Sequence, residues 1–153
     1  EIAPDLPEGG TFLDLGCGWG PIATIMSLES PKAAVWAVDV NSRAVDLTQR
    51  NAQSNGASGV RALKAEEALT ASQESDTRFD VIWSNPPVRI GKDAMHEMLL
   101  AWLGRLAPTG VAYLVVQRNL GADSLITWLN SQGFQASKYA SKKGFRIIEV
   151  RPA

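Results

Sequence analysis

The sequence predicts an α/β fold built around a parallel β-sheet. Short apolar runs, typical of buried strands, alternate with segments of helical periodicity along the 153 residues, and such alternation favours right-handed crossovers between parallel strands. A turn with three glycines, at residues 16–20, joins the first apolar run to the first helical segment. A chain of this length can bury a core of its own, so residues 1–153 are predicted to form one domain.

Each element is predicted from its own pattern. The strand-like segments are residues 11–15, 33–39, 60–65, 79–84 and 111–117. The helical segments are residues 20–29, 42–55, 92–107 and 122–132. On the helix predicted at 92–107, apolar side chains recur at steps of four, three and four and form one stripe: Met95, Leu99, Trp102 and Leu106. Residues 134–140 and 145–150 flank a polar turn and are predicted to pair as an antiparallel hairpin, and residues 70–78 are the most loop-like stretch.

The composition is that of an ordinary globular protein, with 45% hydrophobic and 20% charged residues. No stretch approaches the ~18 uninterrupted apolar residues of a membrane helix, and no signal peptide is visible, so no membrane partner is expected. The single cysteine, Cys17, cannot form an intrachain disulfide, which fits a reducing cytoplasm. Because the chain opens with Glu1 rather than Met, we expect an N-terminal segment that lies outside this sequence.

The glycine-rich turn at residues 14–20 reads Asp-Leu-Gly-Cys-Gly-Trp-Gly and predicts a nucleoside site. Glycines let the backbone approach a ligand closely. They occupy the first and third places of the dinucleotide pattern G-x-G-x-x-G, but Pro21 takes the sixth place, which disfavours NAD. Asp39 ends the second strand 19 residues after Gly20, where a carboxylate can accept hydrogen bonds from both hydroxyls of a ribose. Asp14 is predicted to lie at the floor of the pocket and to meet a positively charged amino group.

A second motif, Asn85-Pro86-Pro87, directly follows the strand at residues 79–84 and predicts a site for a planar amine. The side-chain oxygen of Asn85 and the backbone carbonyl of Pro86 are hydrogen-bond acceptors, and the two prolines hold the backbone nearly rigid. An amine gains positive charge when it attacks a methyl group on sulfur, so acceptors aimed at its hydrogens orient the nitrogen and stabilise the transition state. No strong general base is required, because the methylated amine can lose its proton to water. The two motifs together predict methyl transfer to nitrogen.

These motifs carry a family resemblance. The glycine turn, Asp39 and Asn85-Pro86-Pro87 resemble the class I S-adenosylmethionine-dependent methyltransferases, and the order and spacing agree over the whole chain. The stretch 85–92, Asn-Pro-Pro-Val-Arg-Ile-Gly-Lys, followed by Val-Val-Gln at 115–117 and Gly-Ala at 121–122, is similar to ribosomal RNA guanine-N2 methyltransferases of the small-subunit type. The resemblance implies a Rossmann-like fold with a seven-stranded sheet of order 3-2-1-4-5-7-6, strand 7 antiparallel and helices on both faces. It places the cofactor over the ends of strands 1 and 2 and the substrate near strand 4.

The resemblance also implies site residues. Cofactor-binding residues are expected at the glycine turn and at the ends of the first four strands: Asp14, Gly16, Cys17, Gly18, Trp19, Gly20, Asp39, Val40, Ala65, Glu66 and Asn85. Catalytic residues are expected in the second motif: Asn85, Pro86 and Pro87. The alternative for Glu66 is an exposed helix start. Many amino-methyltransferases carry an aromatic residue after Pro-Pro that stacks on the target base, whereas this chain has Val88, which cannot stack, and the sequence does not identify another stacking residue.

A base in structured RNA must be unstacked before its amine reaches such a pocket, and this requires phosphate contacts around the rim. The candidates are basic residues after the second motif, after the fifth strand and at the hairpin turn: Arg89, Lys92, Arg118, Lys142 and Lys143. Residues 1–80 hold 6 basic and 12 acidic side chains, whereas residues 81–153 hold 9 basic and 4 acidic ones. This split favours RNA, in particular ribosomal RNA or a ribosomal subunit, as the partner of the later half. Scattered solvated charge is the alternative.

Several alternatives stay open at this point. Asn-Pro-Pro suits any planar amide-like nitrogen, so a protein glutamine or a DNA adenine is a second possible methyl acceptor. An NAD-dependent oxidoreductase shares the glycine turn but leaves Asn85-Pro86-Pro87 unexplained, and a non-catalytic RNA-binding module would keep the fold alone. His96, the only histidine, lacks the spacing of metal ligands or catalytic triads, so we predict a surface residue and no metal site.

Overall fold

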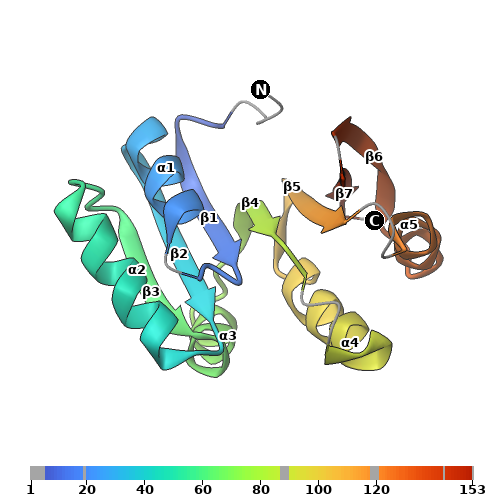
Figure 1. Ribbon diagram of the computed structural model, residues 1–153, viewed down its shortest axis with the longest axis horizontal. Helices are drawn as coiled ribbons and strands as arrows, with labels where there is room; N and C mark the ends of the chain where they lie inside the picture. Colours follow the sequence, from blue (N-terminus) through green and yellow to red (C-terminus); the bar gives the residue numbers. More distant parts are fainter. Residues whose placement is uncertain (1–5, 19, 87–89, 118–120, 143, 153) are drawn as a thin grey trace.

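The chain folds into one twisted seven-stranded sheet with helices on both faces (Figure 1). The computed structural model describes residues 6–18, 20–86, 90–117, 121–142 and 144–152, with the backbone alone at Lys142. The strands are β1 (Gly9–Leu15), β2 (Lys32–Asp39), β3 (Val60–Lys64), β4 (Phe79–Ser84), β5 (Leu106–Gln117), β6 (Gln135–Lys142) and β7 (Phe145–Arg151). The helices are α1 (Pro21–Glu29), α2 (Ser42–Ser54), α3 (Ala65–Glu74), α4 (Lys92–Leu103) and α5 (Ala122–Ser131).

The sheet order confirms the predicted topology. The strands lie in the order β3-β2-β1-β4-β5-β7-β6, and β7 pairs antiparallel with both of its neighbours, whereas the other pairs are parallel. The order reverses between β1 and β4, and such a switch point leaves a crevice at the carboxyl ends of the strands where ligands bind. The strand register brings the carboxyl ends of β1, β2 and β4 to the same level, because Leu15 of β1 lies beside Val38 of β2 and Ser84 of β4.

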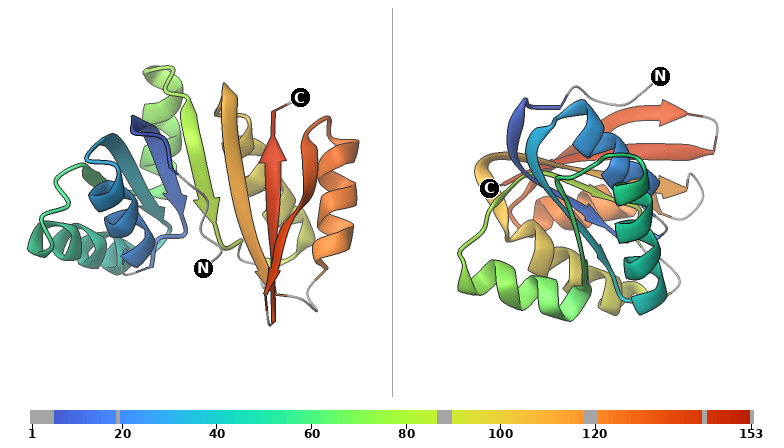
Figure 2. Two further views of the ribbon diagram at one scale, coloured as in Figure 1. Left: turned by 90° about the horizontal axis from the view of Figure 1, so that it is seen from above. Right: turned by 90° about the vertical axis from the view of Figure 1, so that its left-hand side faces the viewer.

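The helices form one layer on each face of the sheet. α1 and α2 cover one face, and α3, α4 and α5 cover the other (Figures 1 and 2). Successive strand residues point to opposite faces, so in β1 Phe12 packs with the layer of α1 and α2, while Leu13 packs with the other layer. Both side chains are fully buried, and burial of a side chain of this size contributes about 1.5–3 kcal/mol to folding.

One predicted loop is a helix. α3 covers Ala65–Glu74, although residue 65 was expected in a strand and residues 70–78 in a loop. Its buried side chains are only Ala68 and Ser72, so the segment lacks the large apolar stripe that marks a helix. Alanine and glutamate favour helix, and Glu66 and Glu67 in the first turn interact favourably with the helix dipole.

The predicted extension of the next helix to residue 107 is wrong. α4 ends at Leu103, and Leu106 begins β5, where it remains buried in the same core as Met95 and Leu99. Gly104 follows the last helical residue, and its N–H donates to the carbonyl of Leu100. The hairpin is present, but β6 continues through Ser141 and Lys142, two residues that were expected in the turn.

Among the described residues, no helix combines the length and the apolar character that a membrane crossing requires.

Candidate functional site

A cavity of about 190 Å³ opens at the carboxyl ends of β1, β2 and β4. Strand-end residues form one side of it: Leu15, Gly16, Val38, Asp39, Val40, Ser84 and Asn85. Ala65 closes it at the start of α3, and Met98 and Trp102 of α4 form an apolar wall. The cavity lies at the switch point of the sheet, where the sequence motifs were predicted to meet.

The glycine turn is fixed in place by backbone hydrogen bonds to β2. The N–H groups of Gly16 and Cys17 both donate to the carbonyl of Val38, at 2.8 and 3.0 Å. Gly16 and Gly18 have positive φ values of 82° and 58°, a region in which residues with a side chain are strained. Gly20 has a second constraint, since a Cβ there would lie 2.7 Å from the Thr48 methyl carbon. The turn therefore needs glycine for conformation and for the close approach of α2.

Thr48 is a contributor that the sequence motifs do not indicate. Its hydroxyl is fully buried on α2, donates to the carbonyl of Gly18 at 3.0 Å and lies 3.3 Å from the Cys17 sulfur. Burial raises the pKa of Cys17 from 9.0 to about 11, so the thiol stays protonated at neutral pH and does not act as a nucleophile. Cys17 thus packs in the turn, and it is not among the residues that line the cavity, so its predicted contact with the cofactor stays a prediction.

Asp39 links the turn to the next helix. One carboxylate oxygen accepts from the Gly18 N–H and the other from the Asn41 N–H, both at 3.0 Å. Asp39 is half-buried and lines the cavity. Each carboxylate oxygen has a second lone pair, so the side chain is held in orientation and can still accept hydrogen bonds from a ligand.

Asp14 lies deeper than Asp39. Its side chain is 3% exposed, and one carboxylate oxygen accepts from the Ala23 N–H in the first turn of α1, at 3.1 Å. Burial raises the pKa of Asp14 from 3.8 to about 7, the Ala23 N–H opposes the rise, and the charge of Asp39 adds to it. Asp14 is not among the residues that line the cavity, so its contact with a ligand amino group stays a prediction.

The second motif borders the same cavity. Asn85 is exposed at the end of β4 and Pro86 is buried, so the side chain of Asn85 is available while the backbone behind it is packed. Next to it, the buried hydroxyl of Ser84 also lines the cavity and has no hydrogen-bond partner among the described residues. A buried polar atom without a partner is costly in a folded protein, so the Ser84 hydroxyl is a candidate for contact with a ligand in the cavity. Sequence reasoning missed Ser84 because nothing in the strand pattern distinguishes it.

These features fit the nucleoside cofactor that the family resemblance implies. A half-buried carboxylate, a backbone turn without side chains, an unpartnered hydroxyl and an apolar wall are the groups that a ribose and an adenine ring require. The predicted residues Gly16, Asp39, Val40, Ala65 and Asn85 do come together around one cavity. Glu66 does not line it and is exposed in the first turn of α3.

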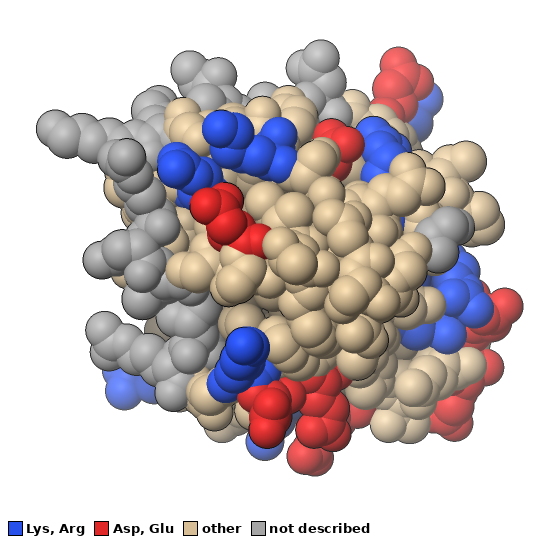
Figure 3. All heavy atoms as spheres, turned by 90° about the vertical axis from the view of Figure 1, so that its right-hand side faces the viewer, with Lys and Arg blue, Asp and Glu red and all other residues tan. Residues whose placement is uncertain are grey.

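The predicted RNA contacts are only partly placed. Arg89, Arg118 and Lys143 lie outside the described residues, as do the predicted cofactor-binding residue Trp19 and the predicted catalytic residue Pro87. The backbone of Lys142 pairs with Phe145, which also pairs with Gln117 at the end of β5, so the hairpin turn lies at the same edge of the sheet as the cavity. On the side of β6 and α5, charged residues of both signs surround a largely uncharged middle (Figure 3).

His96 lies at the surface only in part. The imidazole is half-buried and stacks on the Trp128 ring of α5, with 3.6 Å between ring centroids and 9° between ring planes. Within the described part of the chain, no three His, Cys, Asp or Glu side chains come together as a metal site would require.

Comparison with known proteins identifies the family. Residues 2–149 match the family described as methyltransferase small domain. The uncharacterised protein YbxB of Bacillus subtilis (strain 168) is 34% identical over 144 residues, covering 94% of this chain and 70% of YbxB.

Two further groups of relatives carry functional names. Ribosomal RNA small subunit methyltransferase C of Serratia proteamaculans is 37% identical over 84 residues, covering 54% of this chain and 22% of that protein. Release factor glutamine methyltransferase of Chlorobaculum tepidum is 36% identical over 117 residues, covering 71% of this chain and 40% of that protein. The chain therefore spans less than half the length of either of these two relatives.

Among solved structures, the 16S rRNA N2 methyltransferase RsmC of T. thermophilus, in complex with AdoMet and guanosine, superimposes with a TM-score of 0.75 at 25% identity. The match covers 94% of this chain and 37% of RsmC. The fold, the family match over nearly the whole chain and the cavity at the switch point agree, and the chain belongs to the methyltransferase small domain family as an S-adenosylmethionine-dependent methyltransferase.

Proposed function

We propose that the chain methylates an exocyclic amine, the N2 amine of a guanine in ribosomal RNA. The observation that carries this proposal is the position of Asn85, which is exposed at the end of β4 and borders the same cavity as Asp39 and Ala65. An acceptor beside the cofactor cavity is what an N–H substrate requires.

The cofactor would be held by residues of several strands. Asp39 would accept hydrogen bonds from the ribose hydroxyls, and Val40, Ala65, Met98 and Trp102 would enclose the adenine ring. The hydroxyl of Ser84 would gain the partner that it lacks among the described residues. When bound, S-adenosylmethionine supplies a methyl group on a positively charged sulfur.

Asn85 and Pro86 would act on the substrate by orientation. The Asn85 side-chain oxygen and the Pro86 carbonyl would each accept one N–H of the amine, which turns the nitrogen lone pair toward the methyl group. These acceptors bind more strongly as the nitrogen becomes positive, so they stabilise the transition state more than the ground state. Pro87, which lies outside the described residues, belongs to the same proposed unit.

Ribosomal RNA is favoured as the substrate by two relatives. A methyltransferase named for small-subunit ribosomal RNA shares 37% identity over 84 residues, and the RsmC structure with guanosine shares 25% identity. Contacts from Arg89, Lys92, Arg118, Lys142 and Lys143 to phosphates are part of the proposal, and so is a cytoplasmic location, where ribosomal RNA is available.

A glutamine side chain in a protein is the second candidate substrate. The release factor glutamine methyltransferase of Chlorobaculum tepidum is 36% identical over 117 residues, and a primary amide presents the same two N–H bonds as the guanine amine. The match to a methyltransferase family gives no support to the alternative function of an NAD-dependent oxidoreductase.

The test incubates the protein with S-adenosylmethionine labelled in the methyl group and with ribosomal subunits, naked ribosomal RNA, DNA and total cell protein in separate reactions. We expect label in RNA, recovered after nuclease digestion as N2-methylguanosine. Label in protein as methylglutamine would replace the proposal with the second candidate, and label in adenine would contradict both. Protein with Asn85→Ala serves as the control for a contaminating activity.

A further inference from the structure

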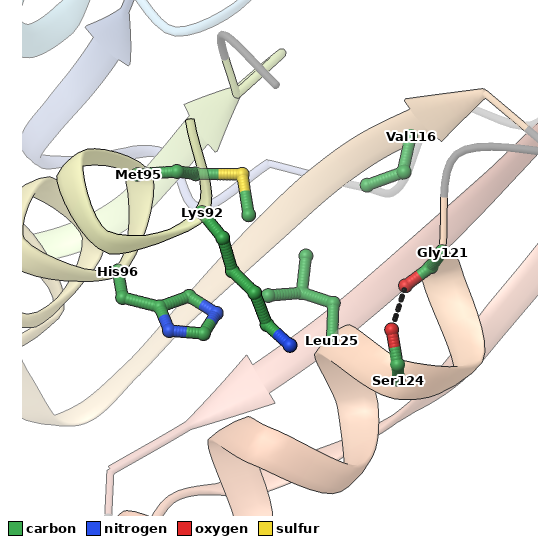
Figure 4. A pocket seen from close by; sticks show the side chains of 7 residues that line it. All are labelled: Lys92, Met95, His96, Val116, Gly121, Ser124 and Leu125. Carbon is green, nitrogen blue, oxygen red and sulfur yellow. Dashed lines mark hydrogen bonds between the residues drawn. The ribbon is translucent and has the colours of Figure 1, made fainter. Parts of the chain in front are cut away.

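A second cavity, of about 230 Å³, lies between the N-terminal ends of α4 and α5, beside the end of β5 (Figure 4). Met95, Val116 and Leu125 give it an apolar floor, and all three side chains are otherwise buried. Lys92, His96 and Ser124 line the same cavity and bring polar groups to it. An apolar pocket with a few convergent polar groups is the usual form of a site for a small planar molecule.

The imidazole of His96 is held in a fixed orientation in this cavity. One ring face stacks on Trp128 at 3.6 Å, which limits rotation of the side chain. Lys92 precedes His96 by four residues, so both side chains lie on the same face of α4. Figure 4 shows the imidazole beside the Lys92 chain, with the Lys92 amino group reaching across the space toward α5.

The Ser124 hydroxyl donates to the Gly121 carbonyl at 3.1 Å, so the donors left for a ligand come from Lys92 and His96. The Lys92 ammonium donates three hydrogen bonds and accepts none, and a neutral imidazole has one N–H. None of the described residues that line the cavity carries a carboxylate. The preferred occupant therefore presents acceptors to Lys92 and His96 and an apolar ring face to Met95 and Leu125. A free phosphate would satisfy the donors but leave the apolar floor uncovered.

The second cavity lies on the same face of the sheet as the cofactor cavity. Ser84 of β4 pairs with Leu114 of β5, so Val116 lies two residues further along the neighbouring strand. Neighbouring strands are about 4.8 Å apart. α4 lines both cavities, since Lys92, Met95 and His96 border one while Met98 and Trp102 border the other.

We propose that Lys92 and His96 read the O6 and N7 edge of the guanine whose N2 amine is held by Asn85. The inference rests on the proposed function and names the residues that select the base. Guanine presents two acceptors on this edge, whereas adenine presents an amino group in place of O6. That amino group would face the Lys92 ammonium, donor against donor, so the cavity discriminates between the two purines.

The test uses His96 as a reporter. It is the only histidine of the chain, so its ring C–H signals in a proton NMR spectrum are assigned without ambiguity. The protein is saturated with S-adenosylhomocysteine at constant pH and titrated with GMP, IMP or AMP in separate experiments. IMP retains O6 and N7 but lacks the N2 amine. We expect GMP and IMP both to shift the His96 signals, with IMP the weaker of the two because it lacks the amine that Asn85 would hold. AMP should bind at least about tenfold more weakly than IMP, which differs from it at the O6 position.

Two matched variants locate the source of the discrimination. Lys92→Met removes the ammonium and keeps most of the side-chain length, so the ratio of the AMP and IMP dissociation constants should fall toward one. Lys32→Met makes the same change at the start of β2, at the opposite edge of the sheet, and should leave the ratio unchanged. Binding of S-adenosylhomocysteine, measured by calorimetry, checks that both variants are folded.

Four outcomes would overturn the assignment: equal affinity for AMP and IMP, an unchanged ratio in Lys92→Met, no shift of the His96 signals with any nucleotide, or a shift with a glutamine-containing peptide but not with GMP. None of these measurements uses methyl transfer. If ribosomal RNA still accepts label while the nucleotide test fails, the proposed function stands and base selection by Lys92 and His96 does not.

Discussion

Asp14 combines deep burial with a carboxylate that titrates near neutral pH. Its pKa is raised from 3.8 to about 7 mainly by burial, while the Ala23 N–H acts in the opposite direction and the nearby Asp39 charge adds to the rise. At pH values between 3.8 and about 7, Asp14 keeps a proton in the folded state that it has lost in the unfolded state. The free energy of unfolding therefore falls as the pH rises through this range. The decrease attributable to this one group is on the order of 4 kcal/mol, complete above about pH 7.

The isosteric change Asp14→Asn removes this titration. We expect urea unfolding at pH 5, 6, 7 and 8 to show a flatter dependence of stability on pH in the variant than in the parent protein. The difference between the two curves isolates Asp14 from the other titrating groups. Parallel curves would mean that the carboxylate is already ionised well below pH 7 in the folded protein.

Asn85 is expected to affect the rate of methyl transfer and not the stability of the fold. Asn85→Ala removes one of the two proposed acceptors and should lower kcat by 10²–10³-fold, about 2.7–4 kcal/mol, if it acts as preorganised acceptors and donors in other active sites do. Cofactor affinity should change little. Steady-state kinetics on the accepted RNA and calorimetry with S-adenosylmethionine measure the two effects separately.

Asn55→Ala is the matched control, because Asn55 is exposed at the end of α2, away from the cavity. Full turnover by Asn85→Ala would remove Asn85 from the catalytic unit. A loss confined to cofactor binding would reassign it to the nucleoside site.

At the scale of elements, α2 supports the glycine turn through a single buried hydroxyl. Thr48→Val keeps the shape of the side chain but removes the hydrogen bond to the Gly18 carbonyl and the contact with the Cys17 sulfur. We expect a loss of about 1 kcal/mol in the free energy of unfolding, together with weaker binding of S-adenosylmethionine, because Gly18 also holds Asp39. Urea unfolding and calorimetry measure the two effects.

Thr127→Val provides the comparison, since the Thr127 hydroxyl is exposed and bonds only within α5, to the carbonyl of Asp123. If the two variants lose equal stability and neither loses affinity for the cofactor, the hydroxyl of Thr48 does not support the site.

At the scale of the whole molecule, the hairpin turn and the cofactor cavity share one edge of the sheet, although β7 and β6 lie beyond β5. This arrangement would let RNA contact both at once. Replacing Lys142 and Lys143 with Ala should weaken RNA binding and reduce the slope of log affinity against log salt by roughly 1–2, since each phosphate contact contributes about 0.7–0.9.

The salt series should be repeated with Lys32→Ala at the opposite edge, which should keep the parent slope. An unchanged slope in the double variant would assign Lys142 and Lys143 to a solvated turn, and the phosphate contacts would then have to come from the residues nearer Asn85.

The sequence predicted the sheet, but it did not predict one helix and two hydroxyl groups near the site. The strands and the two motifs that contain Asp39 and Asn85 were predicted from apolar runs, glycines and prolines, because these report local conformation directly. The strand order was predicted from the family resemblance. α3 was missed because its buried side chains, Ala68 and Ser72, are too small to mark a helical face. Thr48 and Ser84 were missed because an isolated hydroxyl has no pattern along the chain.

The contact between His96 and Trp128 is a second feature that local sequence patterns do not predict. Its ring is paired with Trp128, 32 positions later in the chain, and no local periodicity links the two. Contacts between helices that cross the same sheet depend on the register of the strands between them, which the sequence does not specify locally.

α4 borders both cavities, with Met98 and Trp102 at the cofactor cavity and Met95 and His96 at the second cavity. A shift of this helix when the cofactor binds would alter the wall that faces the proposed guanine, and a shift when the guanine binds would alter the wall that faces the cofactor. Any resulting cooperativity must be reciprocal, so that whichever molecule binds first changes the affinity of the second by the same factor. Order of addition would then affect the kinetics of assembly but not its equilibrium.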